Sequence, residues 1–315
     1  MKVAVVGAGA WGKNLVNTLN KLGCLGPVAE ASQGLRDKLA ETYPGIDLRA
    51  DFAEVLRDPD VKAVAIATPA HTHHPIAKAL LEAGKDVFVE KPMTLVASES
   101  EDLVATAQKH GRVLMAGHLL MYQPAIHKIK ELIKAGAIGQ VFTIHQQRSK
   151  LGRARAVENV LWSFGVHDVA VLLDLVGEAP SDVQVSGHCG LQPGIEDDVY
   201  LHLGFPSGVK AHLHNSWLWP DVARWLVVVG SEGMLVYSET GQKVTLHKKK
   251  IDATLNNVDQ GEEVVFHGSS EPLILEMKHF MQCVEDRSKP LSDGQNGLDV
   301  VRVLEKAERL FRPAA

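Results

Sequence analysis

The stretch Val-Ala-Val-Val-Gly-Ala-Gly-Ala-Trp-Gly at residues 3–12 joins an apolar run to glycines spaced as G-x-G-x-x-G. It predicts a β-strand over 3–6 that turns directly into a helix over 11–22. The first glycine permits the tight turn, the second lets backbone N–H groups approach a pyrophosphate, and the third lets helix and strand pack closely. The helix N-terminus also attracts phosphate. We expect a dinucleotide at this turn, held by Gly7, Gly9, Ala10, Trp11 and Gly12.

Glu30 closes the next predicted strand and lies 18 residues after Gly12. A carboxylate at this position accepts hydrogen bonds from a ribose diol and repels a 2′-phosphate. The expected cofactor is therefore NAD, although Arg36 is close enough in sequence to leave NADP open.

Short β-branched runs alternate with amphipathic segments over the first 120 residues. After the first pair we expect strands at 26–31, 61–67, 87–90 and 113–116, and helices at 35–42, 52–58, 75–83 and 98–110. The strands are apolar on both faces, as in a parallel sheet covered by helices. This pattern predicts a doubly wound α/β Rossmann domain over residues 1–121.

The remainder, residues 122–315, is predicted to be an α+β domain. We expect helices at 125–135, 163–176, 272–286 and 296–311, and strands at 141–148, 183–190, 199–205, 208–217, 224–230, 233–238 and 243–247. Residues 206–208 and 231–233 are typical of hairpin turns, and Lys248–Lys250 is interpreted as a solvated turn. The alternation at 199–203 favours an antiparallel sheet with one covered face.

Composition excludes several classes of protein. Of 315 residues, 45% are hydrophobic and 23% charged, which is typical of globular proteins and not of disordered chains. A net charge of −5 gives no cationic field for nucleic acid or an anionic membrane. Three separated cysteines, and no signal peptide or long apolar span, predict a cytoplasmic protein.

Three further clusters follow predicted strands, at Thr68-Pro69 with His73, at Glu90-Lys91-Pro92 and at Gly117-His118. Loops at the carboxyl ends of parallel strands line the cofactor crevice, so these residues are expected to contact cofactor or substrate. Near a nicotinamide cation, Lys91 could share a proton with a substrate hydroxyl. A structural ion pair between Lys91 and Glu90 is the alternative.

With these motifs, the whole chain resembles the Gfo/Idh/MocA oxidoreductase family. The glycine fingerprint, Thr68-Pro69 with His73, and above all Glu90-Lys91-Pro92 carry the resemblance. It implies a Rossmann domain followed by an α+β domain with an open, mostly antiparallel sheet. It also implies a nicotinamide cofactor, polyol or sugar substrates, and homodimers or homotetramers packed through those sheets.

Members of the family carry a histidine in the second domain, commonly within Asp-x-Gly-x-His. The corresponding residues here are Ser163, Gly165 and His167, so a serine replaces the aspartate. The resemblance implies that Lys91 and His167 are the catalytic residues. A four-residue offset on a helix would place Ser163 and His167 on one face, where the serine could orient substrate or imidazole. A buried structural histidine is the alternative for His167.

A closer resemblance is to the nucleotide-sugar 3-dehydrogenases of this family, which also lack that aspartate. It rests on residues 117–124, 148–153, 158–162 and 191–197. It implies oxidation of the 3-hydroxyl of UDP-N-acetylglucosamine to a ketone, which a PLP-dependent aminotransferase would use for lipid A or another surface polysaccharide. The candidate substrate residues are His118, Tyr122, Arg148, Arg153, Arg155, Asn159, Trp162, Ser163, His167 and Asp168. Arginines suit a diphosphate, and Tyr122 and Trp162 could stack on a sugar or uracil ring.

Other readings of the sequence remain. Fifteen histidines raise the question of a metal, but His71, His73 and His74 lack ligand spacing, and no catalytic metal is expected. The alternatives are a dehydrogenase of a free polyol, inositol or simple sugar, and a non-catalytic NAD-binding sensor. A glycan-binding module is disfavoured, because it would not need the glycine-rich turn.

Overall fold

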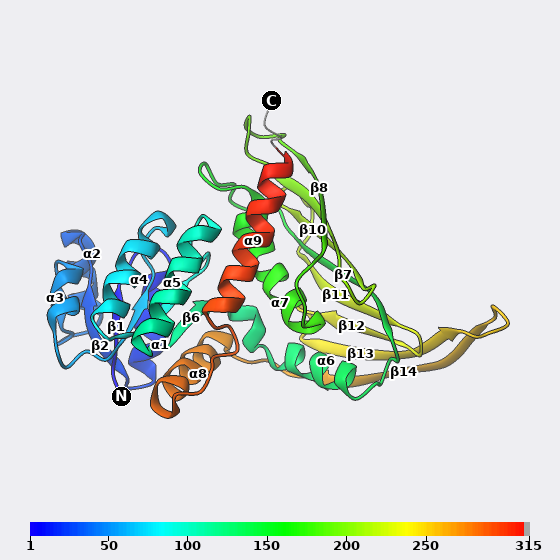
Figure 1. Ribbon diagram of the computed structural model, residues 1–315, viewed down its shortest axis with the longest axis horizontal. Coiled ribbons are helices and arrows are strands. Elements are labelled where there is room, and N and C mark those ends of the chain that lie inside the picture. The colour runs from blue at the N-terminus through cyan, green and yellow to red at the C-terminus, as the bar shows by residue number, and fades with distance from the viewer. Residues whose placement is uncertain (312–315) are drawn as a thin grey trace. The chain divides into compact units, whose positions relative to one another are not determined.

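The computed structural model describes residues 1–311, which divide into two compact units (Figure 1). The first contains Met1–Leu119 and Glu271–Arg302, and the second contains Leu120–Ser270 and residues 303–311. The chain thus returns to the first unit at Glu271. A single division of the chain between residues 121 and 122 does not describe this return. A helix pattern alone does not tell which sheet the helix covers, and the boundary at 121–122 stays a prediction.

The first unit contains a six-stranded parallel sheet. Its strands are β1 (Val3–Val6), β2 (Leu25–Ala29), β3 (Leu48–Arg49), β4 (Ala63–Ile66), β5 (Asp86–Glu90) and β6 (Leu114–Gly117). Their order is β3-β2-β1-β4-β5-β6, and every neighbouring pair is parallel. The order reverses between β1 and β4, which is where an open α/β sheet forms its ligand crevice. The predicted doubly wound Rossmann fold is confirmed.

Helices cover this sheet, close to where the sequence predicts them. They are α1 (Gly12–Lys21), α2 (Gln33–Thr42), α3 (Phe52–Arg57), α4 (His73–Glu82), α5 (Ala97–His110), α8 (Pro272–Asp286) and the first part of α9 (Gly294–Phe311), with a short 3-10 helix at Ala70–Thr72. Helices α4 and α5 lie side by side (Figure 1). Leu80 of α4 and Leu103 of α5 are fully buried with Val64 and Val89 of the strands. The strands are therefore apolar on both faces because helices cover both.

The second unit contains an eight-stranded, mostly antiparallel sheet. Its strands are β7 (Val141–Ser149), β8 (Asp182–His188), β9 (Asp198–Gly204), β10 (Lys210–Ser216), β11 (Ala223–Gly230), β12 (Met234–Ser238), β13 (Lys243–Ile251) and β14 (Asn257–His267). Their order is β14-β13-β12-β11-β7-β10-β9-β8, and only β7 and β10, among these neighbours, run parallel. The turns at 206–208 and 231–233 join antiparallel neighbours, as predicted.

One prediction in this unit is wrong. Lys248–Lys250 is no turn but part of β13, which forms a long hairpin with β14 that the sequence did not reveal. In Figure 1 this hairpin extends beyond the other strands of its sheet. Cross-strand ion pairs explain the strands, because Lys248 lies 2.9 Å from Glu263 and Lys249 lies 3.1 Å from Asp259. Such a polar hairpin lacks the apolar alternation by which strands are recognised.

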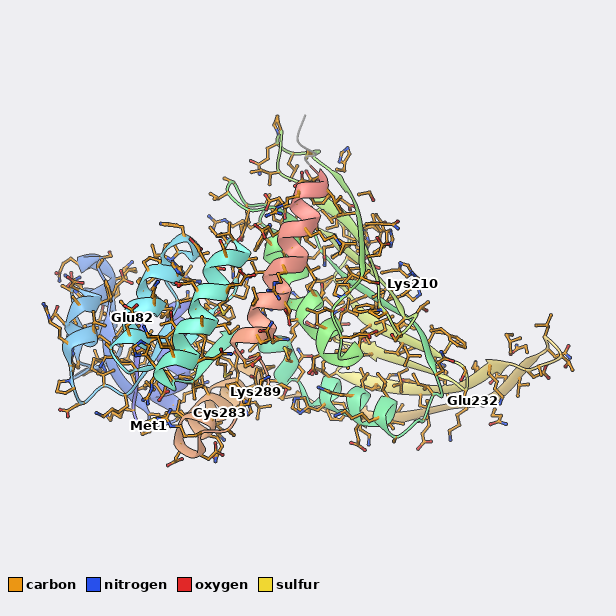
Figure 2. The ribbon with its side chains drawn as sticks, in the orientation of Figure 1. Met1, Glu82, Lys210, Glu232, Cys283 and Lys289 are labelled. Carbon is orange, nitrogen blue, oxygen red and sulfur yellow. The ribbon has the colours of Figure 1, made fainter. Side chains whose placement is uncertain are left out.

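Helices cover one face of the second sheet. They are α6 (Pro124–Lys134) and α7 (Val166–Val176), the latter preceded by a π-helix at Leu161–Gly165, and a 3-10 helix occupies Leu119–Tyr122. Along β10, Ala211 and Leu213 are buried, whereas Lys210 lies on the opposite, uncovered face (Figure 2). The expected sheet with one covered face is present. None of the helices in residues 1–311 has the length and apolar character needed to cross a membrane.

Candidate functional site

The glycine-rich turn of the first unit has the geometry that a dinucleotide requires. Gly7 has φ +89°, and a Cβ atom there would lie 2.8 Å from the Thr68 side chain. At Gly12 a Cβ atom would lie 2.1 Å from the carbonyl oxygen of Gly7, so helix α1 can begin here only with glycine. Around Gly9, by contrast, no described atom lies within 4 Å of the Cβ position. The backbone at Gly9 is therefore open to a ligand, while its neighbours are tightly packed.

Glu30 lies beside this turn, directly after β2. Its carboxylate accepts hydrogen bonds from the backbone N–H groups of Ala8, at 2.7 Å, and Ser32, at 2.9 Å. Arg36 donates instead to the carbonyl oxygens of Glu30 and Ala31. These contacts fix the Glu30 carboxylate next to the glycine-rich turn, where a ribose diol could bind it.

A cavity of about 410 Å³ opens between these residues. It is lined by Gly7, Gly9, Glu30, Thr68 and Pro69 together with the apolar side chains of Leu35, Phe52 and Ile76. Ligand pockets of this size combine apolar walls with a few fixed polar groups. The apolar walls suit an adenine ring, the carboxylate suits a ribose and the glycine-rich turn suits a pyrophosphate, so these residues fit NAD.

His73 connects the loops that follow β4 and β5. Its Nδ1 lies 2.9 Å from the carbonyl oxygen of Pro92, and its Nε2 lies 2.8 Å from that of Thr68. Burial lowers the pKa of His73, which favours the neutral ring and leaves one N–H to donate. The buried side chain therefore lies between the two loops and donates to one of these two carbonyl oxygens.

Glu90 ends β5 and is also buried. One carboxylate oxygen accepts a hydrogen bond from the Trp11 indole N–H, and the other accepts from the backbone N–H of Lys91 at 3.2 Å. Burial raises the pKa of Glu90 to about 7, against the opposing effects of the Trp11 hydrogen bond and the Lys91 charge. Glu90 therefore links the glycine-rich turn to the backbone of the candidate catalytic lysine.

His118 completes the row of residues at the strand ends. Gly117 pairs with Glu90 across β5 and β6, and His118 follows it directly. Neither ring nitrogen of His118 has a hydrogen-bond partner within residues 1–311. Burial and the charge of Lys91 lower the pKa of His118 to about 3, so the ring is neutral at physiological pH. The first unit thus gathers Glu30, Thr68, Glu90, Lys91 and His118 at the carboxyl ends of its strands.

In the second unit, His167 is the second residue of α7, and α7 follows the π-helix directly. The segment predicted as one helix over 163–176 therefore begins within a π-helix and continues as the α-helix α7. A Cβ atom at Gly165 would lie 2.5 Å from the Leu161 side chain and 2.7 Å from Asn215 Oδ1, so this close packing requires glycine. The buried Ser163 hydroxyl accepts a hydrogen bond of 3.1 Å from the Trp217 indole. π-Helical turns are frequent at functional sites.

Arg148 and Asp168 form a buried network in this unit. Asp168 accepts hydrogen bonds from Arg148 Nε at 2.8 Å, from Gln146 and from Asn215. Both terminal nitrogens of Arg148 donate to Glu239. Burial raises the pKa of Asp168, while Arg148 opposes this shift. The guanidinium of Arg148 is therefore committed to two carboxylates of its own unit.

The remaining candidate substrate residues divide into buried and exposed groups. Trp162 is 5% exposed, and its indole donates to Glu308 at 2.9 Å. Asn159 donates to Glu196 at 2.8 Å, and Tyr122 is buried as well. Arg153 and Arg155 lie in an exposed loop, where Arg155 is 3.7 Å from Glu158. These two arginines are exposed, whereas Arg148 of β7 is held in the buried network.

Sequence reasoning missed several residues that complete these networks. They are the fully buried Glu276 of α8 in the first unit, and Gln146, Glu196, Asn215, Trp217 and Glu239 in the second unit. Each is a polar or aromatic residue in, or directly beside, a stretch whose local pattern is ordinary. Only the tertiary fold places them next to the predicted residues, so no signal in the sequence identifies them.

Two family descriptions match the chain. Residues 1–118 match an oxidoreductase family with an NAD-binding Rossmann fold, and residues 126–236 match the GFO/IDH/MocA C-terminal domain. Among curated proteins, the chain is 28% identical to 1,5-anhydro-D-fructose reductase of Ensifer adhaerens, over 78% of this chain and 76% of that protein. It is also 28% identical to scyllo-inositol 2-dehydrogenase (NAD(+)) of Bacillus subtilis, over 92% and 88% of the two proteins.

Solved structures share the fold over nearly the whole chain. A structure described as an oxidoreductase from Magnetospirillum magnetotacticum is 33% identical, with a TM-score of 0.85 over 97% of this chain and 98% of that chain. UDP-N-acetylglucosamine 3-dehydrogenase GnnA from Acidithiobacillus ferrooxidans shares the fold, with a TM-score of 0.87 and 21% identity over 98% and 97%. The chain therefore belongs to the Gfo/Idh/MocA family of oxidoreductases, and its first unit is an NAD-binding Rossmann domain.

Proposed function

We propose that this oxidoreductase converts the 3-hydroxyl of UDP-N-acetylglucosamine to a ketone with NAD as the hydride acceptor. The observation that carries the proposal is the serine at position 163. Polyol-oxidising members of the family commonly have an aspartate at this position of the Asp-x-Gly-x-His motif. The Ser163 hydroxyl is buried and accepts the Trp217 indole N–H, so this position supplies no negative charge. The sequence resemblance to nucleotide-sugar 3-dehydrogenases and the fold shared with GnnA support the same substrate.

The protein would hold NAD with Glu30 at the ribose and the glycine-rich turn at the pyrophosphate. The bound cofactor would supply the acceptor for the hydride of C3 of the sugar. Lys91 or His167 accepts the proton of the 3-hydroxyl as the carbon–oxygen double bond forms. One hydride and one proton thus leave the sugar, and the lysine or histidine returns its proton to solvent before the next turnover.

In this proposal the substrate diphosphate binds in the exposed loop that carries Arg153 and Arg155. Arginine binds phosphate oxygens in a bidentate manner, and both residues are accessible to a ligand. The buried residues Asn159 and Trp162 support the loop and the π-helix through Glu196 and Glu308. Direct stacking of Tyr122 or Trp162 on the substrate remains part of the prediction.

We further propose a cytoplasmic homodimer or homotetramer that associates through the uncovered face of the second sheet. The keto product would pass to a PLP-dependent aminotransferase of lipid A or surface polysaccharide synthesis. Transamination is the chemistry expected next, because a 3-keto sugar is the direct precursor of a 3-amino sugar.

A second candidate is a dehydrogenase of a free polyol, inositol or simple sugar. It is favoured by the names of the curated relatives, which act on an anhydro sugar and on scyllo-inositol. It differs from the first candidate in needing no site for a nucleotide diphosphate.

The test is to incubate the protein and NAD with UDP-sugars and, separately, with inositols and free hexoses. NADH absorbance and the mass of the keto product are both followed, because NADH that stays bound could hide turnover. A 2-oxo acid added to the mixture tests whether bound cofactor is recycled. Keto product from UDP-N-acetylglucosamine alone supports the proposal. Equal or better oxidation of inositol favours the second candidate, and no product from any sugar indicates an NAD-binding sensor.

A further inference from the structure

The first turn of α7 carries a partly exposed imidazole next to a fully buried carboxylate. Among the residues at 166–173, which begin this helix, only His167 is not buried. Asp168, the next residue, is 0% exposed. Side chains that follow one another along a helix point about 100° apart, so the two groups lie on different sides of the same turn.

Asp168 anchors this turn to two strands of the sheet. Its Oδ1 accepts hydrogen bonds from Gln146 at 2.7 Å and from Arg148 Nε at 2.8 Å, both on β7. Its Oδ2 accepts a hydrogen bond of 2.7 Å from Asn215, which lies on β10 directly opposite Arg148. Three donors from two neighbouring strands therefore meet one carboxylate at the start of α7.

The arginine of this group is itself held on its far side. Glu239, which follows β12, accepts from Arg148 Nη2 at 2.8 Å and from Arg224 of β11 at 3.0 Å. Two carboxylates and two guanidinium groups thus alternate from α7 to the end of β12, and their charges balance. The Arg148 side chain is only 9% exposed, so its contacts are screened little by solvent.

Such a network contributes orientation more than stability. Desolvation of buried ions offsets most of their attraction, and apolar side chains of similar volume often stabilise a fold equally well. A guanidinium fixed between two carboxylates, by contrast, accepts each of them in a narrow range of directions. Asn215 is fixed too, because it packs so closely on Gly165 that a Cβ atom there would lie 2.7 Å from its Oδ1. The network therefore determines where the first turn of α7 lies on the sheet.

We propose that Asp168 is a positioning residue for His167, which anchors the first turn of α7 to β7 and β10 and so holds the imidazole at one place and angle for proton transfer. The inference rests on the proposed function, in which His167 contacts the 3-hydroxyl of the sugar. Asp168, which the sequence suggests as a substrate contact, acts through its neighbour in the chain.

The test compares Asp168→Asn with Asp174→Asn, a matched change on the same helix. Asp174 lies near the other end of α7 and pairs with Lys130 of α6, so its replacement removes an ion pair and leaves the first turn intact. Oxidation of UDP-N-acetylglucosamine is followed at a temperature where each variant is fully folded.

We expect kcat to be about 10–100-fold lower in Asp168→Asn, because displacement of a reacting group by about 1 Å lowers the rate to this extent. The KM for the sugar and the dissociation constant of NAD⁺ should stay within about twofold of the wild type, since no binding group is removed. Asp174→Asn should keep the wild-type kcat. An equal loss of kcat in the two variants would overturn the inference, because it would indicate a general effect of α7 stability.

NMR spectra of protein with ¹³C-labelled histidine rings give a reading that needs no sugar. The His167 signal, assigned by its absence in His167→Gln, should be single in the wild type and in Asp174→Asn. In Asp168→Asn it should broaden or split, because the first turn then takes more than one position. If the wild type oxidises no UDP-sugar, the proposed function fails, while this signal still tests the position of the ring.

Gln146→Leu covers the case in which Asp168→Asn does not fold. It removes one neutral donor to Asp168 and leaves the ion pairs in place. We expect kcat to fall by about threefold or more, with a broadened His167 signal. Wild-type kcat and an unchanged His167 signal in the folded variants would overturn the inference.

Discussion

The indole N–H of Trp11 donates a hydrogen bond to the Glu90 carboxylate, which lies 79 residues further along the chain. Trp11 belongs to the glycine-rich turn after β1, and Glu90 is the last residue of β5. The hydrogen bond therefore joins the carboxyl ends of two strands of the NAD-binding domain. A second bond joins Glu90 to the backbone of Lys91. The cofactor turn and the candidate catalytic lysine are therefore held by one buried carboxylate.

Replacement of Trp11 by phenylalanine should weaken both stability and cofactor binding. Glu90 loses a donor while it stays buried, which costs about 1–3 kcal/mol in the free energy of unfolding. We expect the dissociation constant of NAD⁺ to rise several-fold, measured by calorimetric titration. Tyr43→Phe is the control, because it removes only a 3.4 Å surface hydrogen bond to Asn17. Equal effects of the two variants would contradict the role of Trp11.

Replacement of Lys91 by methionine should abolish turnover and leave NAD⁺ binding nearly unchanged. Loss of a proton-transfer group lowers kcat by about 10²–10⁴-fold. Stopped-flow measurement of NADH formation, with NAD⁺ titrations alongside, separates catalysis from binding. Lys62→Met, at an exposed lysine of the same unit, should retain full activity. Preserved turnover in Lys91→Met would leave His167 as the proton acceptor.

Replacement of Glu30 by alanine should reduce the preference for NAD over NADP. The carboxylate is fixed by Ala8 and Ser32 beside the glycine-rich turn, where it would accept ribose hydroxyls. Loss of hydrogen bonds to a charged group is worth about 1.5–3 kcal/mol, or roughly tenfold or more in NAD affinity. Dissociation constants for both cofactors measure the effect, and Asp37→Ala on α2 provides an exposed control. An unchanged ratio of the two constants would exclude Glu30 from ribose recognition.

The fold could be predicted because its signals are local. The spacing from Gly7 to Gly12 and the apolar strands define the Rossmann domain within short stretches, and the parallel order of those strands then gathers Glu30, Thr68 and Glu90 at one edge of the sheet. The helices and strands of that domain were therefore placed within about two residues, apart from the two-residue strand β3.

The buried partners could not be predicted, because they depend on contacts between distant segments. Nothing near Glu276 indicates that α8 buries this carboxylate completely, and Trp162 looks like a stacking ring until Glu308 is seen to accept its N–H. Arg148 looks like a phosphate ligand in a basic stretch, yet its guanidinium meets Asp168 and Glu239. A charged residue in sequence does not reveal whether its partner is a substrate or the protein itself.

His118 should make the protein sensitive to acid. Its pKa is about 3 in the folded state, below the ordinary value of 6.5, because the neutral ring is buried near Lys91. Between these values the unfolded chain binds the extra proton, so stability is retained above pH 6.5 and lost as the pH falls. From pH 6.5 to about pH 5 the loss from this residue is about 2 kcal/mol. Urea denaturation at both pH values should show a smaller loss in His118→Gln.

The control for this measurement is His71→Gln, at an exposed histidine of the same unit. It should keep the pH dependence of the wild type, because the change leaves His118 buried as before. The carboxylates whose pKa values are shifted are the same in all three proteins. Their contribution to the pH dependence of stability therefore cancels in the comparison. If His118→Gln loses as much stability on acidification as the wild type, the ring is not held neutral.

Replacement of Gly165 by alanine should disturb the π-helix that leads to His167. The added methyl group would lie 2.5 Å from the Leu161 side chain and 2.7 Å from Asn215 Oδ1, and Asn215 donates to the buried Asp168. Overpacking of this kind costs about 1–3 kcal/mol in the free energy of unfolding. Gly34→Ala on α2 meets no atom within 4 Å and should be neutral or stabilising. If His167 takes part in turnover, Gly165→Ala should also lower kcat at temperatures where it is fully folded, with NAD⁺ affinity unchanged because the NAD-binding turn lies in the other unit. A loss of stability with full kcat would limit the π-helix to a structural role.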